Sequence, residues 1–489
     1  MRRLLLTTSL LLPLATHAAP TDSDASALRA TWQTWVSTWS NGLVGATGMP
    51  LTVRPDGEQF LLELPFGGRM PDIGVSISEG RVLARIRPGA NGTWIIDDAQ
   101  LPATTKFSTT APAKGAKASA APIESTTLTL GSQKMSGVFD PTLATESRLQ
   151  ADYGAYAMNI TQPTGTQATT IDKVTARTLW TPVAAGRVSM TSDVEFTGYN
   201  QRITEKAGKG ASGTPPVTIS AQRMHINTLA NDVDFTQLGG ALRALFTLQN
   251  ANPNGKLTAA QKTTLQGAVR ALVTVVAGMD SKQEWHGINV RAGDMSFTLK
   301  QATMDFSMNA PDGKLSARMP IALEGFDTPL LPSDAVREFL PRMFVLSPRI
   351  AGVSKAVLLE ALDRVLENTD EKPDMDSEIA NLLSASPITI GLDTLSFDIG
   401  PLRIKGSGAV KVASVDDPKG AAELRATGLD ALIKRANTIP DAKIAVPVLI
   451  FLKGIAETEG NELVWKLAFD DGDFTVNGTN LSDLQLPGK

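Results

Sequence analysis

The sequence predicts an α+β protein dominated by antiparallel β-sheet, with helical hairpins inserted between strands. Apolar and polar residues alternate over long stretches, as at Val82, Ala84 and Ile86, and Gly, Pro, Asn and Asp separate the alternating runs. Period-two alternation bounded by turn residues is typical of antiparallel strands with one buried face. Segments with apolar residues three and four positions apart interrupt these strands, and this spacing indicates helices.

The first twenty residues have the pattern of a secretory signal peptide. Arg2 and Arg3 precede an apolar run that extends to Leu14. The run is about eleven residues long, whereas a helix that crosses a membrane needs about twenty. We therefore expect cleavage between Ala18 and Ala19, a periplasmic location, and no transmembrane segment in the mature chain. The alternative is an uncleaved N-terminal anchor.

Composition excludes several classes of function. The formal net charge is −4, which does not fit a nucleic-acid-binding surface. The chain has no cysteine, so disulfides, thiolate metal sites, cysteine nucleophiles and lipid attachment to an N-terminal cysteine are excluded. A hydrophobic fraction of 42% is enough for a sizeable core, and the length of 489 residues predicts two or three domains.

The first element expected in the mature chain is a helix over residues 22–40. Leu28, Trp32, Trp35 and Trp39 recur at the spacing of one helical face. Tryptophan favours interfaces, so a membrane-surface helix is one interpretation. Because the polar face shows only Arg29, rather than the several lysines and arginines of such helices, we expect this helix to pack on the body of the protein.

Further helices are expected in the second half, over residues 235–249, 258–279, 333–345, 354–367, 421–437 and 442–456. Ser354 is a suitable N-cap. Strand patterns cover residues 217–229 and resume at Gln283, on either side of the first helix pair. The same layout recurs with strands over 388–412 and from Leu463. This similarity indicates an internal duplication of a strand, helix-pair, strand unit.

Changes in composition indicate how the chain is divided. The segments 109–121 and 206–216 are rich in small residues, Gly and Pro, and the acidic segment 368–378 contains a proline. Such segments are typical of exposed loops and linkers. We expect a signal peptide (1–18), an N-terminal amphipathic helix (19–45), a β-rich domain (46–216), a β domain with helix pairs (217–370) and a C-terminal β-αα-β unit (371–489).

Three C-terminal segments carry a resemblance to a known family. These are GPLRIKGSG at 400–408, GLDALIKRAN at 428–437 and LAFDDGDFTVNGTNLSDL at 467–484. They resemble an uncharacterised proteobacterial periplasmic family, domain of unknown function 2125, and the chain is loosely similar to AsmA-like long-sheet envelope proteins. The resemblance implies a periplasmic, β-rich envelope protein without an assigned reaction, and it identifies no functional residues.

The sequence predicts no catalytic residue, no cofactor site and no metal site. His225 and His286 are the histidines that remain after cleavage, and neither belongs to an H-E-x-x-H array. No G-x-S-x-G nucleophile elbow is present. The densest acidic cluster, Asp470-Asp471-Gly472-Asp473, lies between two strand patterns, where Asp-Gly is typical of a tight hairpin turn. We therefore expect a turn there, rather than a calcium site.

The strands of the second half each have one apolar face, and the residues of one such face are Phe297, Leu299, Met304, Phe306 and Met308. An apolar sheet face must be covered by helices, by a second sheet or by a ligand. We expect a non-enzymatic envelope protein that binds or scaffolds, with a lipid, another amphiphile or an envelope protein as its partner. The alternative is a hydrolase of an envelope polymer or lipid, with acids and His225 or His286 brought together by the fold.

Overall fold

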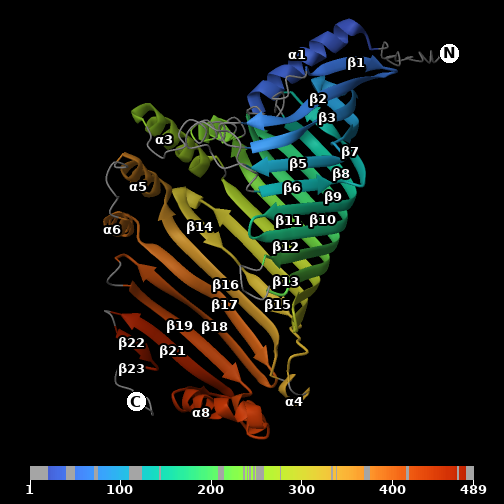
Figure 1. The fold of residues 1–489 in the computed structure, drawn as a ribbon. Helices are drawn as coiled ribbons and strands as arrows, with labels where there is room; N and C mark the ends of the chain where they lie inside the picture. Colours follow the sequence, from blue (N-terminus) through green and yellow to red (C-terminus); the bar gives the residue numbers. More distant parts are fainter. Residues whose placement is uncertain are drawn as a thin grey trace, which may run out of the picture.

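The protein is described by a computed structural model that covers residues 20–39, 50–70, 75–109, 124–141, 145–184, 186–206, 214–234, 258–275, 277–331, 334–337, 339–367, 375–414, 418–470 and 473–480, with scattered residues between 237 and 248. Among these residues, strands form a single 23-stranded sheet whose neighbouring pairs are antiparallel. The sheet runs without a break from the N-terminal strands to the C-terminal strands (Figure 1). The predicted signal peptide, with Ala18 and Ala19, lies outside the described residues, as do most residues of the three predicted linkers.

The N-terminal half of the sheet is a meander with one irregularity. Both β4 and β5 pair with β3. Strand β7 pairs with β4, β6 pairs with β5, and both β6 and β7 pair with β8. Four short strands therefore connect β3 to β8. The strands of this half are β1 (Thr52–Asp56), β2 (Gln59–Met70), β3 (Val75–Pro88), β4 (Trp94–Gln100), β5 (Thr104–Thr109), β6 (Glu124–Thr129), β7 (Ser132–Asp140), β8 (Thr145–Gln162), β9 (Gly165–Ala184), β10 (Arg187–Glu205) and β11 (Val217–Asp234).

The C-terminal half continues the meander. Both β14 and β15 lie between β13 and β16, and β21 pairs with β19, β20 and β22. The strands of this half are β12 (Gly278–Ala292), β13 (Met295–Asn309), β14 (Lys314–Arg318), β15 (Ile321–Glu324), β16 (Pro341–Ser354), β17 (Ile388–Ile399), β18 (Leu402–Val412), β19 (Pro418–Thr427), β20 (Glu457–Glu459), β21 (Glu462–Asp470), β22 (Asp473–Val476) and β23 (Thr479–Asn480).

Helices join the strands at both of their ends. At one end, here the α3 end, lie α3 (Ala259–Thr274), α5 (Lys355–Glu367) and α6 (Met375–Ala385). At the opposite end, here the α8 end, lie α4 (Asp334–Arg337), α7 (Leu429–Ala436) and α8 (Val446–Gly454) (Figure 1). Among the described residues, no helix combines the length and the apolar character that crossing a membrane requires.

Local capping explains where several helices begin. Before α1 (Asp22–Trp39), the Asp24 amide donates to Thr21 Oγ1 at 3.2 Å and the Thr21 amide donates to Asp24 Oδ2 at 3.1 Å. Thr258 and Gln261 form the same reciprocal arrangement at the start of α3. Such capping boxes satisfy amides that would otherwise lack partners. Ser354 caps α5 as predicted, because its hydroxyl accepts from the Val357 amide at 3.4 Å.

Two clusters form the main cores, and each lies where a helix packs on the sheet. Leu28 and Trp32 of α1 pack against Phe60 and Ile86, and Trp32 stacks on Phe139 with ring centroids 4.5 Å apart. The second core joins α7 and α8 to β18, β19 and β21, and its members include Leu402, Leu429, Leu432, Trp465 and Val476. Helix α1 therefore packs on the body of the protein, as the sequence predicts.

Two predicted helices are wrong in extent. Residues 333–345 contain only the short α4, because β16 begins at Pro341 and pairs with both β15 and β17. The helix predicted over 421–437 begins at Leu429, because residues 418–427 form β19 between β18 and β21. The strand predicted from Gln283 begins earlier, at Gly278. In each case, pairing with two neighbouring strands overrides local helix propensity.

The predicted domain division and internal duplication stay predictions. Strand β10 pairs with β11 across the expected boundary at 216/217, and β16 pairs with β17 across the boundary at 370/371. The first predicted helix pair follows β11 at the α3 end, whereas α7 and α8 follow β19 at the α8 end (Figure 1). The predicted Asp-Gly turn fits the structure, since Asp470 pairs with Asp473; the two residues between them lie outside the described part.

Candidate ligand-binding face

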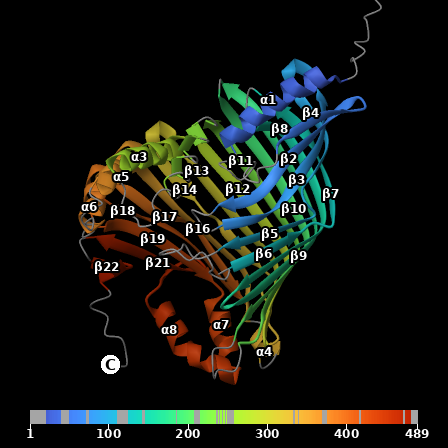
Figure 2. The ribbon, with the colours of Figure 1, turned by 45° about the horizontal axis from the view of Figure 1, so that its top comes forward.

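One face of the sheet carries an unbroken transverse row of apolar side chains. Directly paired residues of antiparallel strands point to the same face, so the row can be followed from strand to strand. Its members, from β8 to β21, are Tyr153, Val174, Phe196, Met224, Trp285, Ala302, Leu323, Phe344, Phe397, Ile404, Ala426 and Leu463. We call the face that bears this row the concave face, because the sheet curves around it so that its two halves stand opposite each other (Figure 2).

A line of left-handed residues crosses the same strands. Ala155 in β8, Gly198 in β10 and Gly287 in β12 have φ values of 49°, 68° and 61°. The pairing register is the same on both sides of this line, as between β10 and β9 around Gly198. Each strand therefore accommodates an extra residue, in the manner of a bulge on both partners. Apolar residues that point to the concave face are consequently three positions apart at the line, as Phe196 and Tyr199 are.

Helices cover both ends of the concave face. Residues that α1 contacts belong to it, because Ala99 pairs with Met135, Met135 with Ala151, and Ala151 lies two positions before Tyr153. Helices α7 and α8 pack on the other end, over Ile404 and Leu463 (Figure 2). Over β8 to β13, Leu238 from the segment after β11 packs against Val188, Ala230 and Val233 near the α3 end of the strands. Away from that cluster, none of the named helices in the described part makes an extended contact with these strands. The centre of the concave face is therefore lined mainly by its own side chains.

The structure places all five residues of the predicted apolar face on the concave face. Phe297 and Leu299 lie on one side of the left-handed line, and Met304, Phe306 and Met308 lie on the other side. Met304 is 38% exposed, and the other four are half-buried. None of the five is fully enclosed, which distinguishes them from core residues such as Phe139 at 1% exposure.

Several polar groups on the concave face are paired with each other. The hydroxyls of Thr178 and Ser192 lie 3.3 Å apart, and those of Thr228 and Ser281 lie 3.2 Å apart. These four residues pair in sequence across β9 to β12, and Ser281 pairs with Phe306. Each hydroxyl pair retains one O–H donor and free acceptor lone pairs. The apolar surface thus includes a short band that can bind a polar group.

Three tyrosine side chains on this face are partly shielded from water. Burial raises the pKa values of Tyr153, Tyr156 and Tyr199. The Tyr153 hydroxyl lies 3.6 Å from Met135 Sδ, and the Tyr156 hydroxyl lies 3.8 Å from Met158 Sδ. Sulfur is a weak acceptor, so these hydroxyls have capacity for a further partner.

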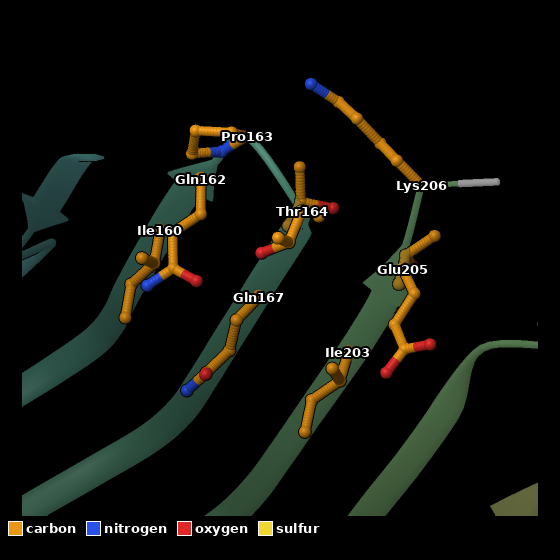
Figure 3. Close-up of a pocket in the computed structure, with 11 residues that line it drawn as sticks. Ile160, Gln162, Pro163, Thr164, Gln167, Ile203, Glu205 and Lys206 are labelled. Atoms are coloured by element: carbon orange, nitrogen blue, oxygen red, sulfur yellow. The ribbon is translucent and has the colours of Figure 1, made fainter. Parts of the chain in front are cut away.

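A cavity of about 710 Å³ lies at the α8 end of β8, β9 and β10. Ile160, Gln167 and Ile203 line it from three neighbouring strands and project to the same side (Figure 3). Glu205 and Lys206 stand at its edge. Its volume lies in the range of small-molecule sites, and Ile160, Gln167 and Ile203 are themselves paired across the strands.

The opposite face of the sheet is polar and charged. His225 Nε2 lies 2.7 Å from Asp193 Oδ2, and its Nδ1 lies 3.7 Å from Glu284 Oε2. The hydrogen bond from Lys282 to Glu284 raises the pKa of Lys282 and lowers that of Glu284. His286 lies on the same face, paired with Arg223. Across the part of the chain that is described, no group of three or more His, Asp or Glu residues is arranged to hold a metal ion.

Comparison with known families places the C-terminal part of the chain. Residues 284–485 match the model of a family described as an uncharacterized protein conserved in bacteria (DUF2125). This segment is similar to the DUF2125 family. It begins in β12 and includes α7, α8 and the concave-face residues from Trp285 onward. The predicted family is thereby confirmed, while the similarity to AsmA-like proteins stays a prediction. No curated protein and no solved structure gave a match to the chain.

Sequence reasoning missed most of the transverse row outside the DUF2125 segment. The sequence analysis relied on strict alternation of apolar and polar residues, and this alternation is interrupted at the left-handed line, whose left-handed residues lie in β8, β10 and β12. A usable signal was present, because several strands contain two apolar residues separated by two others: Tyr153 and Tyr156, Ile171 and Val174, Phe196 and Tyr199, Ala221 and Met224, Trp285 and Ile288, Leu299 and Ala302.

Proposed function

We propose that the protein binds a lipid or another amphiphile along the concave face, as a non-enzymatic component of the bacterial cell envelope. The observation that carries this proposal is the transverse apolar row, whose centre makes no extended contact with a named helix of the described part. Leu238 covers β10 and β11 near the α3 end, against Val188, Ala230 and Val233. Most side chains of the row are half-buried, and an apolar sheet face that no helix covers needs another partner. A ligand would replace water along the row and gain the hydrophobic contribution of the buried area.

The dimensions of the row fit an acyl chain. Neighbouring strands lie about 4.8 Å apart, so the row spans about 24 Å between β8 and β13. The hydrocarbon of one bilayer leaflet is about 15 Å thick, half of the whole core. One extended acyl chain therefore fits across the central strands, and the paired hydroxyls of Thr178, Ser192, Thr228 and Ser281 offer hydrogen bonds to a head group.

The test compares two substitutions at neighbouring positions on opposite faces of β13. Phe306→Asp places a carboxylate on the concave face, while Ser307→Asp places one on the polar face between Asp280 and Arg318. Because Phe306 is half-buried, we expect both variants to fold, with melting temperatures within about 5 °C of each other. Lipids that co-purify from native extract, measured per mole of protein by mass spectrometry, should fall for Phe306→Asp alone.

Two results would speak against the proposal. If wild-type protein carries no lipid and Phe306→Asp unfolds, the face is a closed core and binds no amphiphile. If the purified wild-type protein instead cleaves the lipids it is given, the hydrolase alternative is favoured. Release of free fatty acid, followed by mass spectrometry, distinguishes this case from simple binding.

Export to the periplasm is part of the same proposal. It is supported by the signal-peptide pattern of the first twenty residues. Intact-mass analysis of protein from the periplasmic fraction should show a chain that begins at Ala19. Full-length protein in the membrane fraction would contradict cleavage after Ala18.

A further inference from the structure

Helix α8 and the residues before it expose an unusual amount of apolar surface. Ile444 in the 3₁₀ helix η4 (Pro440–Ala445) is 87% exposed. In α8 itself, Val448 is 59% exposed and Ile450 is 54% exposed. Residues 446–452 read VPVLIFL, without one polar side chain. A helix that is apolar all round is normally enclosed by protein or by lipid, so the exposure of α8 to water requires an explanation.

The exposed helix is held firmly in place. Val446 is buried, and Leu449 packs against the core of α7, β18 and β21. At the C-terminal end of α8, Trp465 Nε1 donates to the Leu452 carbonyl at 2.9 Å, and Lys453 Nζ lies 2.5 Å from Asp430 Oδ1 in α7. The outward side chains are therefore presented by an anchored element, and their ordering costs little when a partner binds.

Basic residues flank this apolar surface along the chain. Between Leu429 and Gly454 the chain has four basic residues, Lys434, Arg435, Lys443 and Lys453, against two acidic ones, Asp430 and Asp441. Lys434, Arg435, Lys443 and Lys453 are all exposed. Apolar side chains flanked by cations complement a bilayer whose head groups are anionic, because the cations attract the head groups while the apolar side chains enter the boundary below them.

We propose that η4 and α8 form a membrane-docking element that inserts shallowly into an anionic lipid surface. With nine residues, α8 is about 13.5 Å long, which is less than half of the hydrocarbon core. It therefore lies in the interface and does not cross. Docking would bring the α8 end of the strands, where the cavity beside Ile160 and Ile203 lies, toward the membrane (Figures 1 and 3). This inference does not depend on ligand binding by the concave face.

The first experiment measures flotation of the protein with vesicles. Vesicles of phosphatidylcholine alone are compared with vesicles that contain about one third phosphatidylglycerol, at low and at high salt. The docking variant carries Ile444→Ser, Val448→Ser and Ile450→Ser. The control variant carries Leu179→Ser and Val183→Ser, which are also exposed apolar residues (47% and 56%) but lie near the α3 end of β9.

We expect wild-type protein and the control variant to bind the anionic vesicles, and binding to weaken at high salt. The affinity of the docking variant for the anionic vesicles should be lower by a factor of about ten or more. Lys443→Glu should also lower this affinity. Equal binding by the docking and control variants would overturn the proposal, as would failure of the wild-type protein to bind. Light scattering tests a further outcome. If the wild-type protein is a dimer and the docking variant is a monomer, the surface binds a second copy of the chain, which would overturn the proposal.

A second measurement reports insertion directly. Because the chain has no cysteine, Val448→Cys provides a single site for an environment-sensitive fluorophore, and Val183→Cys provides the control. Anionic vesicles should shift the emission of the label at position 448 to shorter wavelength and leave the label at 183 unchanged. Unchanged emission at 448 would overturn shallow insertion.

The membrane-docking proposal and the ligand-binding proposal can fail independently. Phe306→Asp should bind vesicles like the wild-type protein, and the docking variant should retain co-purified lipid.

Discussion

The rings of Tyr199 in β10 and Trp285 in β12 meet edge to face, with centroids 6.1 Å apart and an interplanar angle of 80°. The two strands are not neighbours, because β11 lies between them and contributes Ala221, which is 4% exposed. A small side chain there lets the two larger rings meet above it. The contact also joins the two sides of the left-handed line, since Tyr199 follows Gly198 whereas Trp285 precedes Gly287.

The left-handed line makes a prediction about Gly198. At φ +68°, a Cβ at this position would lie 2.0 Å from Asp172 Oδ2 and 2.9 Å from Asp172 Cβ. Gly198→Ala therefore combines backbone strain of about 1 kcal/mol with overpacking of about 1–3 kcal/mol. We expect a loss of about 2–4 kcal/mol in the free energy of unfolding, measured by urea denaturation.

Gly57 offers a matched control for this substitution. It has a similar φ of +64°, but a Cβ there meets no atom within 4 Å. Gly57→Ala should therefore cost only the backbone strain. Combining Gly198→Ala with Asp172→Ala should recover part of the loss. If Gly198→Ala is no more costly than Gly57→Ala, the close packing along the line does not matter for stability.

Much of the local structure could be predicted from the sequence. Local signals were sufficient for α1, predicted over 22–40 and described over Asp22–Trp39, and for α5, which begins after Ser354. They were also sufficient for the hairpin that pairs Asp470 with Asp473. In these cases, a cap, a helical stripe or a turn dipeptide acts within a few residues.

The rest depends on partners that are distant in the sequence. The segment AAELRA at 421–426 has good helix formers, yet it is a strand because β18 and β21 flank it on both sides. The continuous apolar run at 343–346 has no period that distinguishes a helix from a strand. For the candidate site, the sequence placed Phe297 and Phe306 on one face, but the row that extends from Tyr153 to Leu463 needs the pairing register to be known.

A second prediction concerns Asn477, which ties together the end of the α8 connection and two strands. Its Nδ2 donates to the carbonyls of Ile455 at 2.8 Å and Val464 at 3.1 Å, and its Oδ1 accepts from the Lys466 amide at 2.7 Å. Asn477→Ala leaves these groups without the side-chain partner and should lower the free energy of unfolding by about 2–4 kcal/mol. Thermal unfolding followed by circular dichroism measures the effect.

Asn91→Ala is the control for the backbone conformation at Asn477. Both asparagines have positive φ, 49° at position 477 and 56° at position 91, but Asn91 lies in an exposed turn. The control should cost only about 1 kcal/mol. Equal losses for the two variants would show that the conformation, and not the hydrogen bonds, accounts for the effect.

The third prediction concerns pH and the ion pairs near β20. Hydrogen bonds from Lys466 at 2.9 Å and then from Arg425 lower the pKa of Glu459. A carboxyl group with a lowered folded pKa stabilises the fold above its unfolded pKa of about 4.3, and this contribution is lost as pH falls through the folded pKa. Glu459→Gln should therefore lower the melting temperature at pH 7 but not at about pH 2.

Salt provides an independent check of the same ion pairs. The Glu459 side chain is 40% exposed, so 1 M NaCl should screen its interactions and reduce the difference between wild type and Glu459→Gln at pH 7. A difference that persists unchanged at about pH 2 or in high salt would show that the variant acts through packing instead.

The fourth prediction concerns the two histidines. His225 and His286 lie on the polar face, opposite the transverse row, and His225 pairs with Asp193 at 2.7 Å. Replacing both with glutamine keeps a polar side chain at each position and removes any capacity for proton transfer near neutral pH. If the protein binds an amphiphile on the concave face without chemistry, the double variant should retain co-purified lipid and any cellular phenotype of the gene. The melting temperature serves as the control for folding. Loss of lipid or of the phenotype at an unchanged melting temperature would assign a functional role to the polar face and overturn the non-enzymatic interpretation.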